Sequence, residues 1–183
     1  MIFLGIVEIT VPDKPNTETD NSNNPTTPNE PEQPKEEEKP KPKEISAIVT
    51  EANYKYENGN ISAIAPGTSV ETIKNSLTST GGVVTITDAS GKTKETGNIG
   101  TGDKVNITSG ITESLIVLIY GDTNGDGTID KLDASSVLRQ YYGYDKYEGI
   151  YSKALDVNKD GTIDKLDASS ILRSYYGYDS IKQ

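Results

Sequence analysis

Apolar and polar residues alternate over short runs in the middle of the chain, between residues 44 and 120. Residues 54–67, YKYENGNISAIAPG, read as two strands around Asn58-Gly59, the pair that a type I′ hairpin favours. Further apolar runs predict strands within residues 83–93, 103–108 and 114–120. The last of these, SLIVLIY, is apolar enough to be largely buried.

One stretch of this middle segment, residues 68–77, has helical spacing instead. Thr68 followed by Glu71 fits a capping box, in which each side chain accepts the other residue's backbone N–H. A partly apolar face runs along Val70, Ile73, Asn75 and Leu77. The pattern therefore predicts a β-rich module that contains one helix.

Helical spacing returns twice near the C-terminus, over residues 131–142 and 165–176. Gly143 and Gly177 follow as C-cap residues. Apolar residues three and four apart predict one buried stripe in each helix. The stripes are Ala134, Val137, Leu138 and Tyr141, and Ala168, Ile171, Leu172 and Tyr175.

A proline-rich segment, residues 12–43, precedes these elements. It holds eight of the nine prolines and no aliphatic or aromatic residue, so we expect a disordered linker. Residues 1–11 read as the remnant strand of a domain truncated upstream. The expected fold class is two small domains: a β-rich (α+β) module over residues 44–120, and an all-α domain with two calcium loops over residues 121–183.

Charge and missing residue types narrow the possible functions. The net charge is −10, and no basic cluster offsets it, so neither nucleic acid nor an anionic membrane is an expected partner. Without cysteine or histidine, the chain has no thiolate metal site, no cysteine nucleophile and no imidazole base. The opening MIFLGIVEIT is too short for a signal peptide or a membrane helix. No catalytic constellation is evident, so we expect no enzyme.

The C-terminal part repeats itself after 34 residues. Gly121–Tyr147 and Leu155–Ile181 share 20 of 27 positions, with aspartates at fixed intervals rather than solenoid packing residues. The spacing matches a twelve-residue calcium loop, whose positions 1, 3, 5, 7, 9 and 12 serve the ion. These positions are Asp122, Asn124, Asp126, Thr128, Asp130 and Asp133 in the first loop, and Asp156, Asn158, Asp160, Thr162, Asp164 and Asp167 in the second.

Two Ca²⁺ ions are therefore expected, with position 7 binding through its carbonyl and position 9 through a water. Turns rich in Asp, Asn and Gly occur in many proteins, but two copies in one register favour calcium loops. Ile129 and Ile163 occupy position 8, where we expect a short β-bridge between the loops. Four carboxylates repel one another in each empty loop, so the repeats are expected to unfold largely without calcium.

The duplicated loop and helix, Asp at both twelfth positions, and the location after a proline-rich linker resemble a dockerin of type I. The resemblance covers Tyr120 to the C-terminus and implies an adaptor that binds a cohesin module of a scaffoldin outside the cell. It also implies a monomer when unbound and attachment to the cell surface through the scaffold. The GTGDKV motif and the strand running into YGD resemble the small X-modules of cellulosome or amylosome components.

The outward helix faces are the expected partner-binding surface. A leucine, an arginine and a tyrosine beside small serines form a compact anchor set for a protein. The candidates are Lys131, Leu132, Ser135, Arg139 and Tyr142, with Lys165, Leu166, Ser169, Arg173 and Tyr176 as counterparts. Ser136 and Ser170 are also expected to point outward. Because the two faces match, a further hypothesis is binding in two orientations related by a half-turn.

Other readings stay open at this point. The dockerins best known carry Ser-Thr at loop positions 10 and 11, and Lys-Leu stands there in this chain, which leaves the cohesin type undecided. A calcium-stabilised cell-surface spacer without a cohesin partner is the alternative function. Tyr54 and Tyr56 are weak candidates for carbohydrate binding, and Tyr120 and Tyr178 for a contact that joins the two ends of the C-terminal domain.

Overall fold

The computed structural model describes residues 41–183. The strand expected at residues 1–11 and nearly all of the linker expected at residues 12–43 lie outside the described residues. Contacts among residues 41–183 join this part of the chain into one compact unit. Within this part of the chain, no helix is long and apolar enough to cross a membrane.

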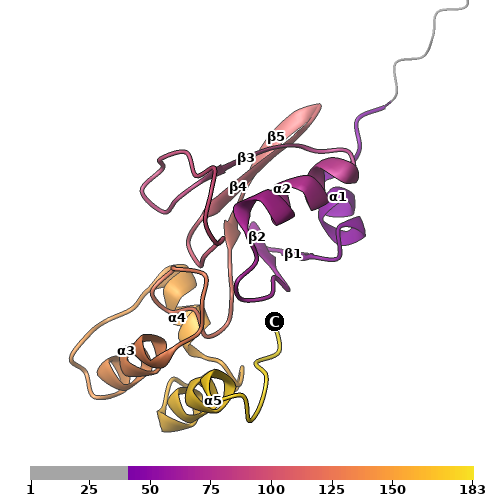
Figure 1. Cartoon of the computed structure of the whole chain (residues 1–183). Helices are drawn as coiled ribbons and strands as arrows, with labels where there is room; N and C mark the ends of the chain where they lie inside the picture. The colour runs from indigo at the N-terminus through magenta and orange to yellow at the C-terminus, as the bar shows by residue number, and fades with distance from the viewer. Residues whose placement is uncertain (1–40) are drawn as a thin grey trace, which may run out of the picture. The chain divides into compact units, whose positions relative to one another are not determined.

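Five strands form one sheet in the order β1-β2-β5-β4-β3 (Figure 1). All neighbouring pairs run antiparallel except β2 and β5, which are parallel. Alternating side chains bury one face: Val84 and Ile86 point into the core, whereas Val83 is 68% exposed. The strands are β1 (Lys55–Glu57), β2 (Asn60–Ser62), β3 (Val83–Thr87), β4 (Lys104–Ser109) and β5 (Ile111–Val117).

The hairpin expected around Asn58-Gly59 is confirmed. Tyr56 pairs with Ile61 across antiparallel β1 and β2. Asn58 and Gly59 have φ angles of 50° and 74°, the left-handed values that a type I′ turn requires. The short sequence signal was sufficient here because the turn chemistry is local.

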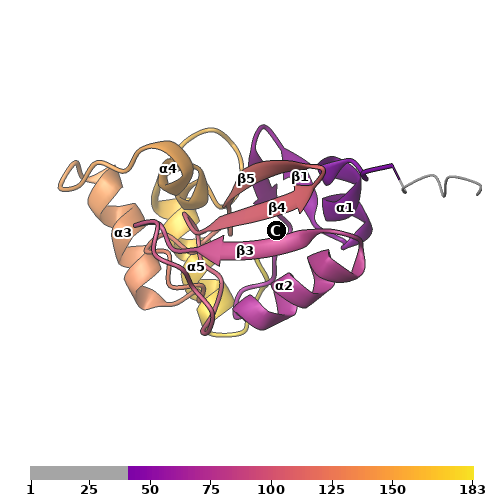
Figure 2. The same cartoon turned by 90° about the horizontal axis from the view of Figure 1, so that it is seen from above.

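Two helices, α1 (Ile45–Glu51) and α2 (Val70–Ser79), join the sheet in one apolar core (Figure 2). The expectation of a single helix in this module is wrong, since α1 precedes the sheet. Its seven residues are too few for helical spacing to stand out from alternation. Ile48 of α1 and Ile73 of α2 are fully buried, so both helices contribute to the core.

The expected capping box at Thr68 and Glu71 is also wrong. Ser69 is the N-cap of α2, and its Oγ accepts the N–H of Thr72 at 3.1 Å. Thr68 instead donates its hydroxyl to the carbonyl of Ala65 at 2.6 Å. Two adjacent residues can each cap a helix, and the turn that ends at Thr68 decides between them.

The remaining helices are α3 (Lys131–Tyr141), α4 (Gly149–Leu155) and α5 (Lys165–Tyr175). They surround a second core of six buried residues: Ala134, Val137, Leu155, Val157, Ala168 and Ile171. Sequence spacing predicts α3 and α5 almost to the residue but misses α4, which spans only seven residues. The chain reaches the first loop from β5 without a helix and reaches the second through α4 (Figure 1).

Candidate calcium loops and partner face

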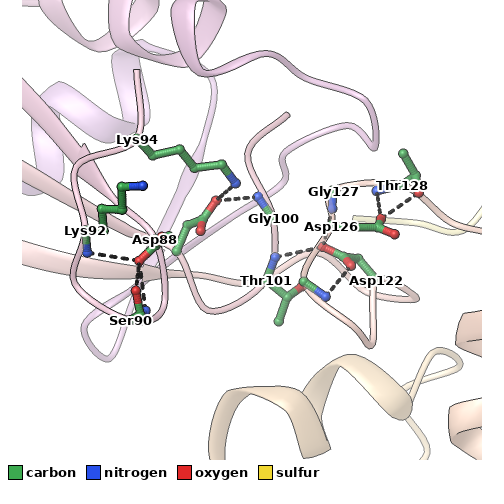
Figure 3. Close-up of polar contacts among 12 residues, drawn as sticks. Asp88, Ser90, Lys92, Lys94, Gly100, Thr101, Asp122, Asp126, Gly127 and Thr128 are labelled. Carbon is green, nitrogen blue, oxygen red and sulfur yellow. Dashed lines mark hydrogen bonds and ion pairs between the residues drawn. The ribbon is translucent and has the colours of Figure 1, made fainter. Parts of the chain in front are cut away.

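The first loop, residues 122–133, begins with a fully buried aspartate. Asp122 Oδ1 accepts the N–H of Gly125 at 2.8 Å, and Oδ2 accepts the N–H of Gly127 at 3.2 Å. Oδ2 also accepts the N–H of Thr101 at 2.7 Å, from outside the loop (Figure 3). Asp122 therefore organises the turn of the loop around its own carboxylate.

The last two acidic residues of the loop also start helix α3. Asp130 is its N-cap and accepts the N–H of Leu132, while Asp133 Oδ2 accepts the N–H of Asp130 at 2.8 Å. Asp133 Oδ1 reaches back to the N–H of Thr123 at 2.9 Å. A capping box and the closure of the loop thus use the same carboxylates.

Asn124, Asp126 and Thr128 shape the exposed middle of the loop. Asn124 Oδ1 accepts the N–H of Asp126 at 2.9 Å, and Asp126 Oδ1 accepts the N–H of Thr128 at 2.8 Å. Each side chain turns the backbone two residues further on, as Asx turns do. These turns fold the middle of the loop through hydrogen bonds among its own residues.

The second loop, residues 156–167, repeats this architecture. Asp156 Oδ2 accepts the N–H of Gly161 at 3.0 Å, and Asp167 Oδ1 accepts the N–H of Val157 at 2.9 Å. Asp164 caps α5 with the same capping box. Lys159 takes the place of Gly125 and keeps its left-handed backbone, with φ angles of 63° and 80°.

The donor set of both loops fits calcium in kind and in order. Carboxylate, amide and carbonyl oxygens alternate with other residues over twelve positions, and calcium prefers six to eight such oxygens. Among residues 41–183, no three or more Asp or Glu side chains form a ready-made metal group. Several of their oxygens accept backbone N–H groups of their own loop, so the fit rests on the identity and order of the ligands.

Burial sets the electrostatics of the first loop. Loss of hydration raises the pKa of Asp122 to about 6, although the N–H groups of Thr101, Gly125 and Gly127 oppose this. Burial likewise raises the pKa of Asp133. In the exposed part of the second loop, the hydroxyl of Thr162 lowers the pKa of Asp160. Burial therefore disfavours the charged form of both carboxylates unless a proton or a cation neutralises it.

The expected partner-binding residues lie on the exposed faces of α3 and α5. Leu132 and Leu166 are 65% and 63% exposed, and Tyr142 and Tyr176 are 56% and 60% exposed. Lys131, Ser135, Arg139, Lys165, Ser169 and Arg173 are exposed as well. The structure thus brings both sets of candidates to the surface.

Contacts between lysines and tyrosines join the two faces into one surface. Lys165, at the start of α5, lies over the rings of Tyr141 and Tyr142, 5.4 and 5.5 Å from their centroids. Lys131, at the start of α3, lies 5.7 Å from the ring of Tyr175 at the end of α5. Each helix therefore begins beside the end of the other.

The arginines on this surface are held by aspartates that follow the helices. Arg139 Nη2 donates to Asp145 Oδ1 at 2.9 Å, and Arg173 lies 3.7 Å from Asp179. Asp145 raises the pKa of Arg139 by hydrogen bonding. Sequence reasoning missed both aspartates, although the repeated Gly-Tyr-Asp after each helix could have indicated them.

Some expected side-chain orientations are wrong. The prediction that Tyr141 and Tyr175 belong to the buried stripes is wrong, because these side chains are 45% and 42% exposed. Helix ends project beyond the small core, and tyrosine keeps its hydroxyl in water there. Ser136 and Ser170, for which an outward direction is expected, are partly exposed. Ser170, for example, donates its hydroxyl to the carbonyl of Leu166 at 2.9 Å.

Two expected contacts are absent from the described residues. The isolated β-bridges among residues 41–183 do not include Ile129 and Ile163, which instead pack against the helical core. Tyr178 is 76% exposed and does not hold Tyr120. The backbone of Tyr120 bonds the side-chain amide of Gln183 at 2.8 and 2.9 Å, and Lys159 Nζ lies 3.9 Å from its ring centroid.

Comparison with known proteins gives a match for the segment that carries the two loops. Residues 120–174 match the family model described as the dockerin type I domain. Neither the curated proteins nor the solved structures yielded a match. The family match supports a dockerin module in the segment that carries both loops, α3, α4 and most of α5.

The raised pKa of Asp122 predicts an acid-stabilised calcium-free state. Its folded pKa, about 6, lies above the ordinary 3.8, so folding favours the protonated form and stability rises as the pH falls. Without calcium the helical part is largely unfolded near pH 7, so we expect acidification of the stripped chain to about pH 5 to restore part of it, by about 1 kcal/mol. The helical circular dichroism signal of the stripped chain at both pH values measures this recovery.

Asp122→Asn is the matched control, because an amide does not titrate in this range. The variant is expected to show a smaller acid gain, which the raised pKa of Asp133 would supply. A calcium-free wild-type chain that loses stability over the same interval would contradict the prediction.

Proposed function

We propose that this chain is a calcium-dependent adaptor that docks its parent protein onto a cohesin module of a scaffoldin. The observation that carries the proposal is the duplicated unit, in which each loop's aspartates cap a helix with an exposed Leu, Arg and Tyr face. The dockerin match over residues 120–174 supports it, because dockerins are non-catalytic docking modules. The setting is an extracellular polysaccharide-degrading complex of the cellulosome or amylosome type.

Two Ca²⁺ ions are proposed, one for each loop. Asp122, Asn124, Asp126, Asp130, Asp133 and the Thr128 carbonyl would hold the first, and the residues 34 positions later the second. Calcium supplies the positive charge that lets these carboxylates share one loop. The residues themselves fix the direction of each helix, because the N-cap and the N3 residue of the helix belong to the loop.

The recognition chemistry follows from the exposed side chains. Leu132 and Leu166 offer apolar anchors, while the arginines, already aligned by Asp145 and Asp179, lose little freedom when they bind a partner's acceptors. Tyrosines around them add area that tolerates partial hydration. An apolar groove with acidic or carbonyl groups at its rim is the complementary surface.

The arrangement of the helices supports two binding orientations. Because each helix begins beside the end of the other, a half-turn exchanges one candidate set for the other. The surface presented after the half-turn carries the same residue types. A partner that accepts one orientation is then expected to accept the second.

Calcium removal is expected to unfold α3 and α5. Each helix depends on carboxylates that repel one another without an ion, so chelator should lower the helical circular dichroism signal. In Asp167→Ala, the bound ions measured by calorimetry should fall from two to about one, since the variant loses the twelfth ligand of one loop. Asp179→Ala, outside both loops, is the control. An unchanged helical signal in chelator would count against the calcium role.

Substitution of the faces tests the two orientations. Leu132→Ala with Arg139→Ala, or Leu166→Ala with Arg173→Ala, should weaken cohesin binding only about twofold, because one orientation remains available. The quadruple variant should not bind. Titration calorimetry against a cohesin retained from a panel measures this, and loss of binding in either double variant would disprove dual orientation.

A pull-down separates the adaptor from a structural spacer. The full chain is presented to immobilised cohesins of several types, with calcium and with chelator. An adaptor is retained by at least one type only when calcium is present. A folded, calcium-loaded chain that no cohesin retains would favour the spacer.

A further inference from the structure

The first loop packs directly on a turn that precedes β4, residues 98–103. The Thr101 N–H donates to Asp122 Oδ2 at 2.7 Å, and the N–H of Gly67, from the segment before α2, donates to the carbonyl of Gly127 at 2.7 Å. Figure 3 shows this turn beside the loop. Two hydrogen bonds from the sheet part of the molecule (residues 41–119) therefore end on the first loop.

Thr101 is itself held rigidly. Its hydroxyl donates to the carbonyl of Ile119 and accepts the N–H of the same residue, both at 3.1 Å. Asp103, two residues after Thr101, accepts the N–H of Gly100 at 2.8 Å and a hydrogen bond from Lys94 Nζ at 2.6 Å. The Thr101 N–H that donates to Asp122 thus belongs to a turn that hydrogen bonds hold in place at both Thr101 and Asp103.

Glycines make this approach possible. A Cβ on Gly100 would lie 2.1 Å from the carbonyl oxygen of Gly125, and a Cβ on Gly127 would lie 2.3 Å from that of Ile99. A Cβ on Gly125 would lie 2.6 Å from the carbonyl oxygen of Thr101. At these three glycines, backbone therefore packs directly against backbone.

Among residues 41–183, no backbone turn packs against the second loop in this way. Gly161, the counterpart of Gly127, has no atom within 4 Å of an added Cβ, and Lys159 stands where the first loop needs Gly125. Asp156 accepts hydrogen bonds only within its own loop among the described residues. Asp122 is fully buried, whereas Asp156 is half-buried.

We propose that the turn 98–103 is an outer wall of the first calcium site, with Thr101 as its positioning residue, and that it makes the two sites unequal. The inference rests on calcium binding by both loops, as proposed above. A loop already held by external hydrogen bonds loses less conformational freedom when it takes its ion. The first site therefore binds calcium more tightly, and the second site empties first.

Stepwise calcium removal from the full chain tests this inequality. The amide signals of Gly127 and Gly161 are followed by NMR as chelator is added. The Gly161 signal is expected to change at a free calcium concentration about tenfold higher than the Gly127 signal, the ratio given by one net charge-assisted hydrogen bond. In excess chelator, the Gly127 amide should exchange with deuterium more slowly than that of Gly161.

Gly100→Ala is the decisive variant, because it lies outside both loops and closes the gap to Gly125. Affinity at the first loop is expected to fall about tenfold, to the level of the second loop, which itself stays unchanged. Thr101→Val is a second variant that keeps the side-chain volume and removes the bridge to Ile119. Slow exchange of the β4 amides verifies in each case that the sheet is folded.

Gly127→Ala and Gly161→Ala form a matched pair. Both glycines have left-handed φ angles, 81° and 87°, so both substitutions carry the same backbone strain, but only the first meets the carbonyl of Ile99. Gly127→Ala should weaken its own site more than Gly161→Ala weakens the other.

The outcomes separate the two proposals. If two ions bind with equal affinity and both loops show equal exchange protection, the proposed role of the turn 98–103 is wrong. The proposed calcium-dependent adaptor function would then still stand. Failure of both loops to bind calcium would overturn the adaptor and the wall together. Two unequal sites that Gly100→Ala and Thr101→Val leave unequal would also overturn the wall.

Discussion

The helical part of this molecule depends on carboxylates that serve a loop and a helix at once. Asp130 and Asp133 close the first loop by accepting its backbone N–H groups, and they also form the capping box of α3. Asp164 and Asp167 do the same for α5. A helix of eleven residues is marginal by itself, so its direction and stability derive from the state of the loop that precedes it.

This coupling explains why so small a core is sufficient. Six fully or nearly buried residues lie between α3, α4 and α5, and the faces turned away from them are free to carry a docking surface. Leu132 and Leu166 are exposed at matching places on the two helices, and apolar side chains that gather on a surface are typical of protein interaction sites. This exposure is consistent with the docking surface proposed above.

Sequence alone could supply the local features and little of the contact between distant segments. The hairpin at Asn58-Gly59, the limits of α3 and α5, and the outward Leu132 and Arg139 follow from turn chemistry and spacing. The seven-residue helices α1 and α4 could not be predicted, since two turns leave no periodic signal.

At the candidate site, the ordered oxygens were readable from spacing, whereas the donor from Thr101 was not. Nothing near Thr101 in the sequence points to Asp122, and the contact exists because Thr101 is bound to Ile119, three residues before the loop. The sequence carries one indication of the contact: the position held by Gly125 in the first loop is held by Lys159 in the second. This difference could be interpreted only once the structure showed that the turn at Thr101 packs against Gly125.

The two hydrogen bonds between the Tyr120 backbone and the Gln183 side-chain amide have a mechanical consequence. Tyr120 follows the strand that enters the helical part, and two hydrogen bonds tie its backbone to residue 183. A pulling force applied through β5 therefore also loads the segment after α5. The hydrogen bonds to Gln183 must break before the force can unfold the first loop. Parallel bonds loaded together resist a pull better than bonds that break one after another.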